Sequence, residues 1–505
     1  KKILYILTPI ERKQGGLLVI LVLIMALLDT MGVASILPFM AVISKPDIIQ
    51  TNIYLNKMFE ASSIFGVENN QEFLFVLGIF VFVLLVGSLT FKAFTFYVQS
   101  RFIQMRQYSI SKRLVEGYLQ QPYSWFLNRN SADLGKTILT EVSMVVGNGL
   151  KPLMELITKG AVTIALVTLL VLVNPKLSLL VGLTFGLFYS FIYKFTRNFL
   201  DRIGKESLKN NQLRFIAISE AFGAAKEVKV GRLEQTYIKR YSDPAKTMAQ
   251  HRASSAVISQ LPRFALEAIA FGGIMLMMLY LMRQTGGIVN ALPIISLYVF
   301  AGYRLMPAMQ SIYAALAKLR FVGASLDALV NDIKNLKILK LKKDQSVLSF
   351  NKHITLKNIY YNYPNASRTT LKDININIPA KTTVGLVGAT GSGKTTIVDI
   401  ILGLLEAQNG SLEVDGKIIK EQNSKSWQRS IGYVPQHIYL ADDTVAANVA
   451  FGVDPKDINQ EAVEKASKIA NLHEFVIEEL PKKYQTNIGE RGIKLSGGQR
   501  QRLGI

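Results

Sequence analysis

Residues 388–395 read Gly-Ala-Thr-Gly-Ser-Gly-Lys-Thr and fit the pattern G-x-x-x-x-G-K-[ST]. They follow an apolar run at 383–387, which predicts a strand, and they precede a predicted helix at 395–405. Glycines in such a loop let backbone N–H groups close around phosphate oxygens, at a helix start whose partial charge favours anions. The stretch therefore predicts a nucleotide phosphate site formed by Gly388, Thr390, Gly391, Ser392, Gly393, Lys394, Thr395 and Thr396.

Two side chains of this loop have predicted roles of their own. Lys394 would reach the β- and γ-phosphates, and the hydroxyl of Thr395 would ligate Mg²⁺. The loop by itself leaves kinases, helicases and GTPases open as function classes.

A second glycine-containing stretch narrows the choice. Residues 495–499 read Leu-Ser-Gly-Gly-Gln, follow Ile-Gly-Glu-Arg-Gly at 488–492 and precede Arg-Gln-Arg. This sequence resembles the signature of ATP-binding-cassette (ABC) ATPases. The resemblance implies that ATP and Mg²⁺ are the cofactors, and that the γ-phosphate bound by a partner subunit is capped by Ser496, Gly497, Gly498 and Gln499. A homodimer would then enclose two ATP molecules.

The resemblance also assigns residues between the motifs. Gln436, in Tyr-Val-Pro-Gln, matches the glutamine that contacts Mg²⁺ and the attacking water, so it is the predicted catalytic and metal-binding residue. Tyr363 matches the aromatic residue that stacks on adenine. Tyr361 in that role, or simple packing of either ring in the sheet, remains open.

The family's Walker B strand, catalytic glutamate and switch histidine have no match in the 505 residues. Asp399 and Asp415 stand at the wrong sequence positions to replace that glutamate. The resemblance therefore implies that the 505-residue chain binds ATP weakly and does not turn it over. We expect the natural protein to continue beyond Ile505 and, since the chain opens with Lys rather than Met, to begin before residue 1.

Short apolar segments alternate with amphipathic ones around these motifs. Strands are predicted at 353–359, 371–378, 383–387, 412–414 and 431–434. Strands that alternate with helices are typical of a parallel α/β sheet. We predict an α/β P-loop cassette with a helical subdomain at residues 346–505, and a linker rich in Lys, Asn and Asp at 331–345.

The first 330 residues have a different character. Over the whole chain 50% of residues are hydrophobic, 19% are charged and the mean hydropathy is +0.26. Soluble chains carry about 25% charged residues, so this composition excludes a disordered protein and disfavours a wholly soluble enzyme. The lack of cysteine excludes a disulfide scaffold, a cysteine zinc site and a thiol nucleophile. Six apolar stretches predict membrane-spanning helices at 17–40, 73–98, 153–173, 177–195, 257–282 and 289–315.

The positive charge is concentrated between these spans. The chain has 58 Lys and Arg against 36 Asp and Glu, a net charge of +22. Many of the cations lie in the segments between spans two and three and between spans four and five, which the positive-inside rule places in the cytoplasm together with both termini. A nucleic-acid partner is therefore an unnecessary hypothesis. Each basic segment predicts an out-and-back helical pair, with turns near residues 121–126 and 221–224.

Six spans ahead of one cassette resemble the half-transporter arrangement of ABC exporters. The resemblance implies an α-helical transmembrane domain (residues 1–330) with long intracellular extensions, working as a homodimer. It also implies a multi-pass protein of the bacterial cytoplasmic (inner) membrane with its cassette in the cytoplasm.

Three cations stand inside the predicted spans. Lys92, Arg263 and Arg304 lie at similar depths, about 22–30 Å from the outer ends of their helices. Cations in a membrane interior are costly, and they are functional candidates for that reason. They predict an anion site for a phosphate or pyrophosphate headgroup. The alternative is structural pairing of Arg263 with Glu267 and of Asp29 with Lys92 or Arg304, with Lys92 reaching toward the interface.

The local sequences Pro-Arg-Phe-Ala-Leu-Glu at 262–267 and Tyr-Arg-Leu-Met-Pro at 303–307 resemble the PglK-type lipid-linked oligosaccharide flippase. Asp29 in span one adds to this resemblance, and residues 48–65 would match its external helix. The implied substrate is a lipid-linked glycan. A peptide or drug exporter remains open, and so does an ATP-sensing membrane scaffold that transports nothing.

Overall fold

The computed structural model describes residues 2–62, 67, 69–173, 175–284, 288–336, 347–364 and 369–505, with part of the side chains between residues 177 and 304. Contacts divide the chain into two compact units, Lys1–Gln121 with Trp125–Leu339 and Pro122–Ser124 with Lys340–Ile505. The predicted linker overlaps the end of helix α15 (Gly323–Asn335), and its positions 337–345 lie outside the described residues. The domain boundaries therefore stay a prediction.

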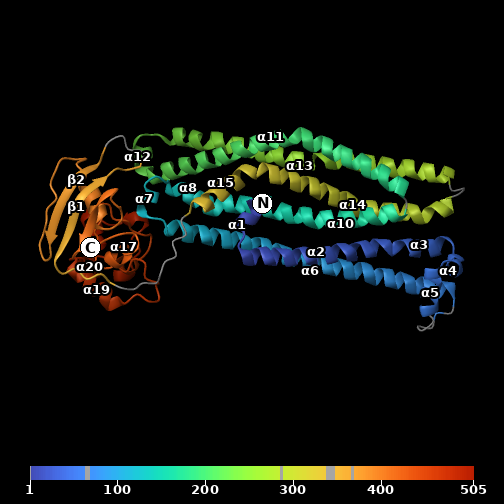
Figure 1. Ribbon diagram of the computed structural model, residues 1–505, viewed down its shortest axis with the longest axis horizontal. Helices are drawn as coiled ribbons and strands as arrows, with labels where there is room; N and C mark the ends of the chain where they lie inside the picture. Colours follow the sequence, from blue (N-terminus) through green and yellow to red (C-terminus); the bar gives the residue numbers. More distant parts are fainter. Residues whose placement is uncertain are drawn as a thin grey trace. The chain divides into compact units, whose positions relative to one another are not determined.

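The first unit consists of helices (Figure 1). The long ones are α2 (Pro9–Ala34), α6 (Asn70–Leu119), α10 (Lys151–Val173), α11 (Pro175–Gly223), α13 (Glu234–Gln284) and α14 (Ile288–Phe321). The short ones are α1 (Lys2–Ile6), α3 (Ile36–Ser44), α4 (Ile48–Thr51), α5 (Ile53–Ser62), α8 (Ser131–Lys136), α9 (Val142–Val145), α12 (Ala225–Val230) and α15. The short helix α7 (Tyr123–Phe126) is divided between the two units. Two π-helical segments, Thr137–Glu141 and Val146–Leu150, flank α9.

Five of the six predicted spans each fall within one long helix, and the first, at 17–40, runs through α2 and past Ser35 into the short α3. Among the described residues, three helical stretches have the length and composition to cross a membrane, namely Pro9–Ser44, Asn70–Leu119 and Ser131–Val173. The predicted spans at 177–195, 257–282 and 289–315 lie in α11, α13 and α14, which have 49, 51 and 34 residues. At about 1.5 Å per residue, each of these is longer than a bilayer core. The predicted turns are confirmed, since α6 ends at Leu119 before α7, and α11 ends at Gly223 before α12.

Local signals explain where the first long helix begins. Thr8 caps α2 in a capping box: its Oγ1 accepts the Glu11 N–H at 3.3 Å, and its own N–H donates to Glu11 Oε2 at 2.8 Å. Glu11 is buried and also meets Arg106 of α6, Oε1 to Nη1, at 2.9 Å. The start of α2 is thereby fixed against α6.

The helices pack in pairs around several apolar clusters. α11 lies beside α13, α10 beside α14, and α2 beside both α6 and α10 (Figure 1). One cluster joins α2, α10 and α14 through residues such as Met25, Leu166 and Leu305. Another joins α11 to α14 through Leu200 and Phe321. At that contact the helices approach closely, because a Cβ on Gly204 would lie 2.2 Å from the backbone oxygen of Phe321.

The second unit holds a four-stranded sheet of order β2-β1-β3-β4. Its strands are β1 (His353–Tyr361), β2 (Leu371–Pro379), β3 (Asn409–Val414) and β4 (Lys417–Ile418), and every pairing is antiparallel. Its helices are α16 (Lys394–Ile401), α17 (Ser424–Gln428), α18 (Val445–Val449), α19 (Gln460–Ile469), α20 (His473–Glu478) and α21 (Gly497–Gly504). Short 3₁₀ turns lie at Lys483–Gln485 and Glu490–Gly492.

This unit has two separate hydrophobic cores. One contains sheet residues with α16 and Trp427, whose indole N–H donates to the Ile401 carbonyl at 2.7 Å. The other is built by α18 to α21 around Val476, Tyr484 and Leu503. The helical subdomain that the sequence predicted is therefore present as a core of its own.

The prediction of a parallel sheet is wrong for the described residues. The strands predicted at 353–359, 371–378 and 412–414 are present, but they pair antiparallel, and the segments 383–387 and 431–434 form no strand. A parallel strand needs a neighbour for its backbone groups and burial on both faces. Here Val387 is 94% exposed, and Val384, Tyr433 and Val434 are exposed too. Their apolar sequence predicts strands, but neither segment has a ladder partner in the described part of the chain.

The close contact of α11 with α14 gives a stability prediction. Gly204→Ala would place a methyl group against a backbone oxygen that cannot rotate away, an overpacking that costs about 1–3 kcal/mol. We expect a lower melting temperature for the detergent-purified protein, measured by intrinsic fluorescence. Gly186→Ala is the matched control on α11, since a Cβ there meets no atom within 4 Å. Equal melting temperatures for the two variants would contradict the close approach.

Candidate functional site

The glycine-rich loop leads directly into α16, as its sequence predicted. Gly391 has φ 82° and Gly393 has φ 91°, conformations that residues with a Cβ rarely adopt. Gly393 is the N-cap of α16, and a Cβ on it would lie 2.6 Å from Leu371 Cδ2. Only glycine therefore lets the backbone turn from the loop into the helix here, which leaves the first N–H groups of α16 facing the loop.

Lys394 curls back over the loop. Its Nζ donates to the carbonyl oxygens of Gly388 at 2.8 Å and Ala389 at 2.9 Å. The ammonium group thus already lies within the loop, where a bound phosphate would compete for it. The neighbouring Thr395 is exposed, and its hydroxyl makes no hydrogen bond to any described residue, so it is available as a ligand.

The two candidate tyrosines have different surroundings. Tyr361 is buried among the core residues beside the sheet. Tyr363 is half-buried, meets Tyr361 edge to face at 5.2 Å, and its hydroxyl lies 3.1 Å from Thr396 Oγ1 at the start of α16. Tyr363 is therefore the ring nearer to the loop, while its contact with adenine stays a prediction.

Ser496 and Gln499 form the start of α21. The Ser496 Oγ accepts the Gln499 N–H at 3.3 Å, and the Ser496 N–H donates to Gln499 Oε1 at 2.7 Å. The serine O–H remains free to donate, because its oxygen is the acceptor in this cap. A Cβ on Gly497 or Gly498 would meet no atom within 4 Å, so the helix start is open for an approaching anion. The signature resemblance assigns these residues to the phosphate of a partner subunit, and the structure shows that they begin a helix.

The other polar residues that the sequence analysis discussed differ in their surroundings. Gln436 is exposed in the irregular stretch after 431–434 and makes no hydrogen bond to a described residue. Asp415 binds the backbone N–H groups of Asn351, Lys352 and His353 at 2.7–2.9 Å, and these bonds lower its pKa. Burial raises the pKa of Asp399. The Asp415 carboxylate is thus used in hydrogen bonds to the backbone at the start of β1, which agrees with the prediction that it does not replace the catalytic glutamate.

These features fit a nucleotide triphosphate with its metal ion. The loop has the glycine conformations, the ammonium group and the free hydroxyl that a phosphate and a Mg²⁺ ion require, and Lys394, Thr395 and Gln436 would hold them. Among the described residues no cluster of three or more His, Cys, Asp or Glu side chains could hold a metal without a phosphate.

The cations of the helical unit lie beside acids. Lys92 Nζ on α6 lies 3.5 Å from Asp29 Oδ2 on α2, and the Asp29 side chain is only 2% exposed. Lys159 on α10 interacts electrostatically with Lys92, Asp29 and Glu155. Lys159 therefore lies near the ion pair that Lys92 forms with the buried Asp29. Sequence analysis did not single out Lys159, which lies inside the predicted span 153–173; its i,i+4 spacing from Glu155 was the available signal.

The other two candidates are not brought to this cluster by any described contact. Arg263 Nε on α13 lies 2.8 Å from Glu267 Oε1, the pairing that the sequence left open. Arg304 lies in α14, and its side chain falls outside the described part of the structure. An anion site that contains all three cations therefore stays a prediction.

Family comparisons agree with both units. Residues 371–505 match the model described as "ABC transporter", and residues 19–307 match "ABC transporter transmembrane region". The second match alone spans more than half of the chain.

The chain belongs to the ABC transporter family.

This ABC transporter has the half-transporter arrangement, a helical transmembrane region followed by an ATPase cassette, and the predicted fold class is confirmed. It resembles a solved chain titled "Structure of a bacterial Atm1-family ABC exporter with ATP bound", with a TM-score of 0.73 at 19% identity over 98% of this chain and 82% of that one. At this identity the likeness concerns the fold alone.

Curated relatives align over most of the transporter. The "ATP-dependent lipid A-core flippase" of Wigglesworthia glossinidia brevipalpis is 28% identical over 406 residues, 79% of this chain and 68% of that protein. The proteins of the same name from Legionella pneumophila (strain Paris) and Cupriavidus pinatubonensis are 28% and 26% identical, over 76% and 78% of this chain. The alignments cover 64% and 66% of those two proteins, about two thirds of their length.

The glycine loop gives a binding prediction. Gly393→Ala would force a Cβ onto Leu371 and strain the φ of 91°, so we expect at least a tenfold loss of ATP affinity, about 1.4 kcal/mol. Titration of the full-length protein with a fluorescent ATP analogue measures it. Gly385→Ala is the matched control, because a Cβ there meets no atom within 4 Å. An unchanged affinity in Gly393→Ala would contradict the assigned site.

Proposed function

We propose that this protein is a homodimeric, ATP-driven exporter that flips an amphipathic lipid with a phosphate or pyrophosphate head across the bacterial cytoplasmic membrane. The observation that carries this proposal is Lys92 beside the buried Asp29 in the transmembrane region, with the ammonium group of Lys159 on α10 within electrostatic reach of both. The relatives named as flippases support the same class of substrate. The cassette and both termini would lie in the cytoplasm.

Lys92 and Lys159, the lysine pair, would act by electrostatic attraction. A cation inside a membrane costs about 2.5–3.5 kcal/mol on insertion scales, so each lysine needs a partner. Asp29 can neutralise one of the two, and Glu155 lies one helical turn from Lys159. A phosphate group could replace the carboxylate as the partner of Lys92. Arg263, now held by Glu267, and Arg304 would extend this site along α13 and α14.

The cassettes would drive the movement. Lys394 and the α16 N–H groups of one cassette would hold the ATP phosphates, and Ser496 with Gly497 and Gly498 of the partner would cap them. Mg²⁺, bound through Thr395 and Gln436, would neutralise phosphate charge. Closure of this sandwich would reach the spans through the long intracellular helices.

Two lipid classes compete within this proposal. The short helices α4 and α5 occupy residues 48–62, where the resemblance to the PglK-type flippase predicted an external helix, and they favour a lipid-linked oligosaccharide. The names of the relatives favour a lipid A-core substrate. A peptide or drug exporter would need no cation pair, and an ATP-sensing scaffold would need no substrate.

Stimulation of the ATPase separates these candidates. The full-length protein in lipid nanodiscs is assayed with lipid-linked oligosaccharide, lipid A-core, an amphipathic peptide and a hydrophobic dye. We expect stimulation by a phosphate-bearing lipid alone, with the lipid-linked oligosaccharide as the favoured substrate. Stimulation by peptide or dye alone would contradict the flippase, and no stimulation by any compound would favour the scaffold.

The lysine pair gives a second prediction. Lys92→Gln with Lys159→Gln should reduce lipid-stimulated ATPase activity at least fivefold, because the headgroup loses both ammonium groups, while Lys159→Arg should keep most of it. Lys112→Gln is the control on α6, since Lys112 is exposed in a surface pair with Glu116 at 3.7 Å. Equal stimulation in the double variant and in this control would contradict the site.

A further inference from the structure

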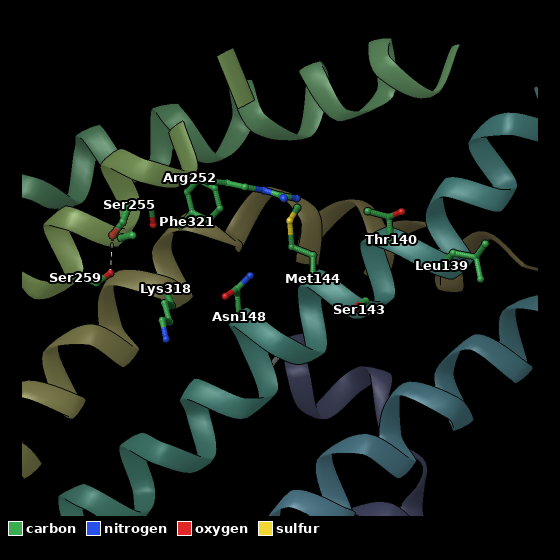
Figure 2. A pocket seen from close by; sticks show the side chains of 11 residues that line it. Leu139, Thr140, Ser143, Met144, Asn148, Arg252, Ser255, Ser259, Lys318 and Phe321 are labelled. Carbon is green, nitrogen blue, oxygen red and sulfur yellow. Dashed lines mark hydrogen bonds between the residues drawn. The ribbon is translucent and has the colours of Figure 1, made fainter. Parts of the chain in front are cut away.

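A cavity of about 490 Å³ lies within the helical unit, far from the cassette motifs in sequence. Figure 2 shows its walls: the segment with both π-helical turns contributes Thr140, Ser143 and Asn148, α13 contributes Arg252, and α14 contributes Lys318. Its volume lies in the range of sites for small molecules or headgroups, about 300–1,000 Å³. π-helical turns are often found at functional sites.

The charge of the cavity is positive and uncompensated. Arg252 and Lys318 line it, and no acid is among the lining residues that the structure describes. Neither cation makes an ion pair or a hydrogen bond with another residue in the described part of the chain. In Figure 2 the Arg252 side chain extends from α13 toward the helix that carries Met144 and Asn148.

The acids near the cavity have other partners. Glu141, next to the lining residue Thr140, is buried; its Oε1 accepts from Asn211 Nδ2 at 2.8 Å, while its Oε2 has no hydrogen-bond partner among the described residues. Glu206 lies 2.8 Å from His251 Nε2, beside Arg252, and Asp201 lies 3.7 Å from Arg320. None of these acids forms an ion pair with Arg252 or Lys318 in the described part of the chain.

Neutral donors complete the lining. The side chains of Thr140, Ser143 and Asn148 make no hydrogen bond to a described residue and offer two hydroxyl groups and one amide. A guanidinium group binds a phosphate through two parallel hydrogen bonds, and an ammonium group adds a point charge. Three neutral donors beside two cations match the several oxygens of a phosphate group better than a single carboxylate.

We propose that this cavity is a phosphate-binding site, separate from both the cassette and the Lys92–Lys159 pair. Arg252 lies about 16 Å from Arg263 along α13, and Lys318 about 21 Å from Arg304 along α14, in each case toward the basic end of its helix. The ligand is a phosphate group, carried by a lipid head or by a soluble molecule. This binding needs no nucleotide and does not rest on the flippase proposal.

The test compares two probes on the full-length protein in detergent without ATP, by isothermal titration calorimetry. Inorganic pyrophosphate represents the soluble source, and dihexanoyl phosphatidic acid the lipid source, with dihexanoylglycerol as its uncharged counterpart. Any binding of pyrophosphate by the cassette loop is common to all variants, so the difference between variants reports the cavity.

Arg252→Gln with Lys318→Gln should weaken binding at least tenfold, and Lys246→Gln, which removes an exposed cation from the same helix α13, should leave it unchanged. If Arg252→Gln with Lys318→Gln weakens the binding of both probes, the cavity is a site open to soluble phosphates. If it weakens the binding of the lipid alone, the cavity is a site for lipid headgroups. Thr140→Val with Ser143→Ala keeps both cations and should weaken binding about threefold. This second variant keeps the proposal testable if Arg252→Gln with Lys318→Gln does not fold. Unchanged binding in both multiple variants, or equal weakening in Lys246→Gln, would overturn the proposal.

Discussion

The backbone N–H groups at the start of a helix have no partners within that helix, and two helices of the cassette leave such groups open behind glycines. One is α16, entered through Gly393 in a left-handed conformation, and the other is α21, entered through Ser496. The helix dipole and the free N–H groups make each a place for negative charge. The two starts belong to different hydrophobic cores, one built on the sheet and one on helices α18 to α21. Everything proposed for ATP depends on both starts binding one triphosphate, each from a different copy of the chain.

In the cassette, polar groups without partners form the proposed ATP site, whereas in the transmembrane region a charge needs a partner. In an apolar solvent a charge is stable only with a partner, and two of the predicted site cations have one: Lys92 beside Asp29, and Arg263 beside Glu267. Pairing and substrate binding are compatible if the substrate's phosphate exchanges with the carboxylate. Lys159 strengthens this reading because it adds a second positive charge near the Lys92–Asp29 pair. The cavity around Arg252 and Lys318 differs, since its cations face polar uncharged groups and no acid.

Sequence patterns predicted those parts whose chemistry is local. The long helices, the glycine loop, the capping serine and the breaks after Leu119 and Gly223 all follow from hydropathy, caps and turn residues close together in the chain. The parallel sheet was wrong because an apolar run such as 383–387 becomes a strand only if a neighbour pairs with it, and that neighbour is not a local property. Lys159 and the Arg252 cavity were missed for the same reason, because their surroundings are formed by helices that are distant in sequence and adjacent in space.

The most direct test of the central claim is an ATP-dependent crosslink between copies. The 505 residues contain no cysteine, so Ala389→Cys in the glycine loop and Ile493→Cys beside the signature are the only thiols that these residues contribute to the double variant. A short bifunctional thiol reagent is applied with and without ATP and Mg²⁺, and the products are separated by mass. The account predicts a crosslinked dimer that forms with ATP and is absent without it. Crosslinks confined to single chains, or a yield of dimer that ATP does not change, would contradict it.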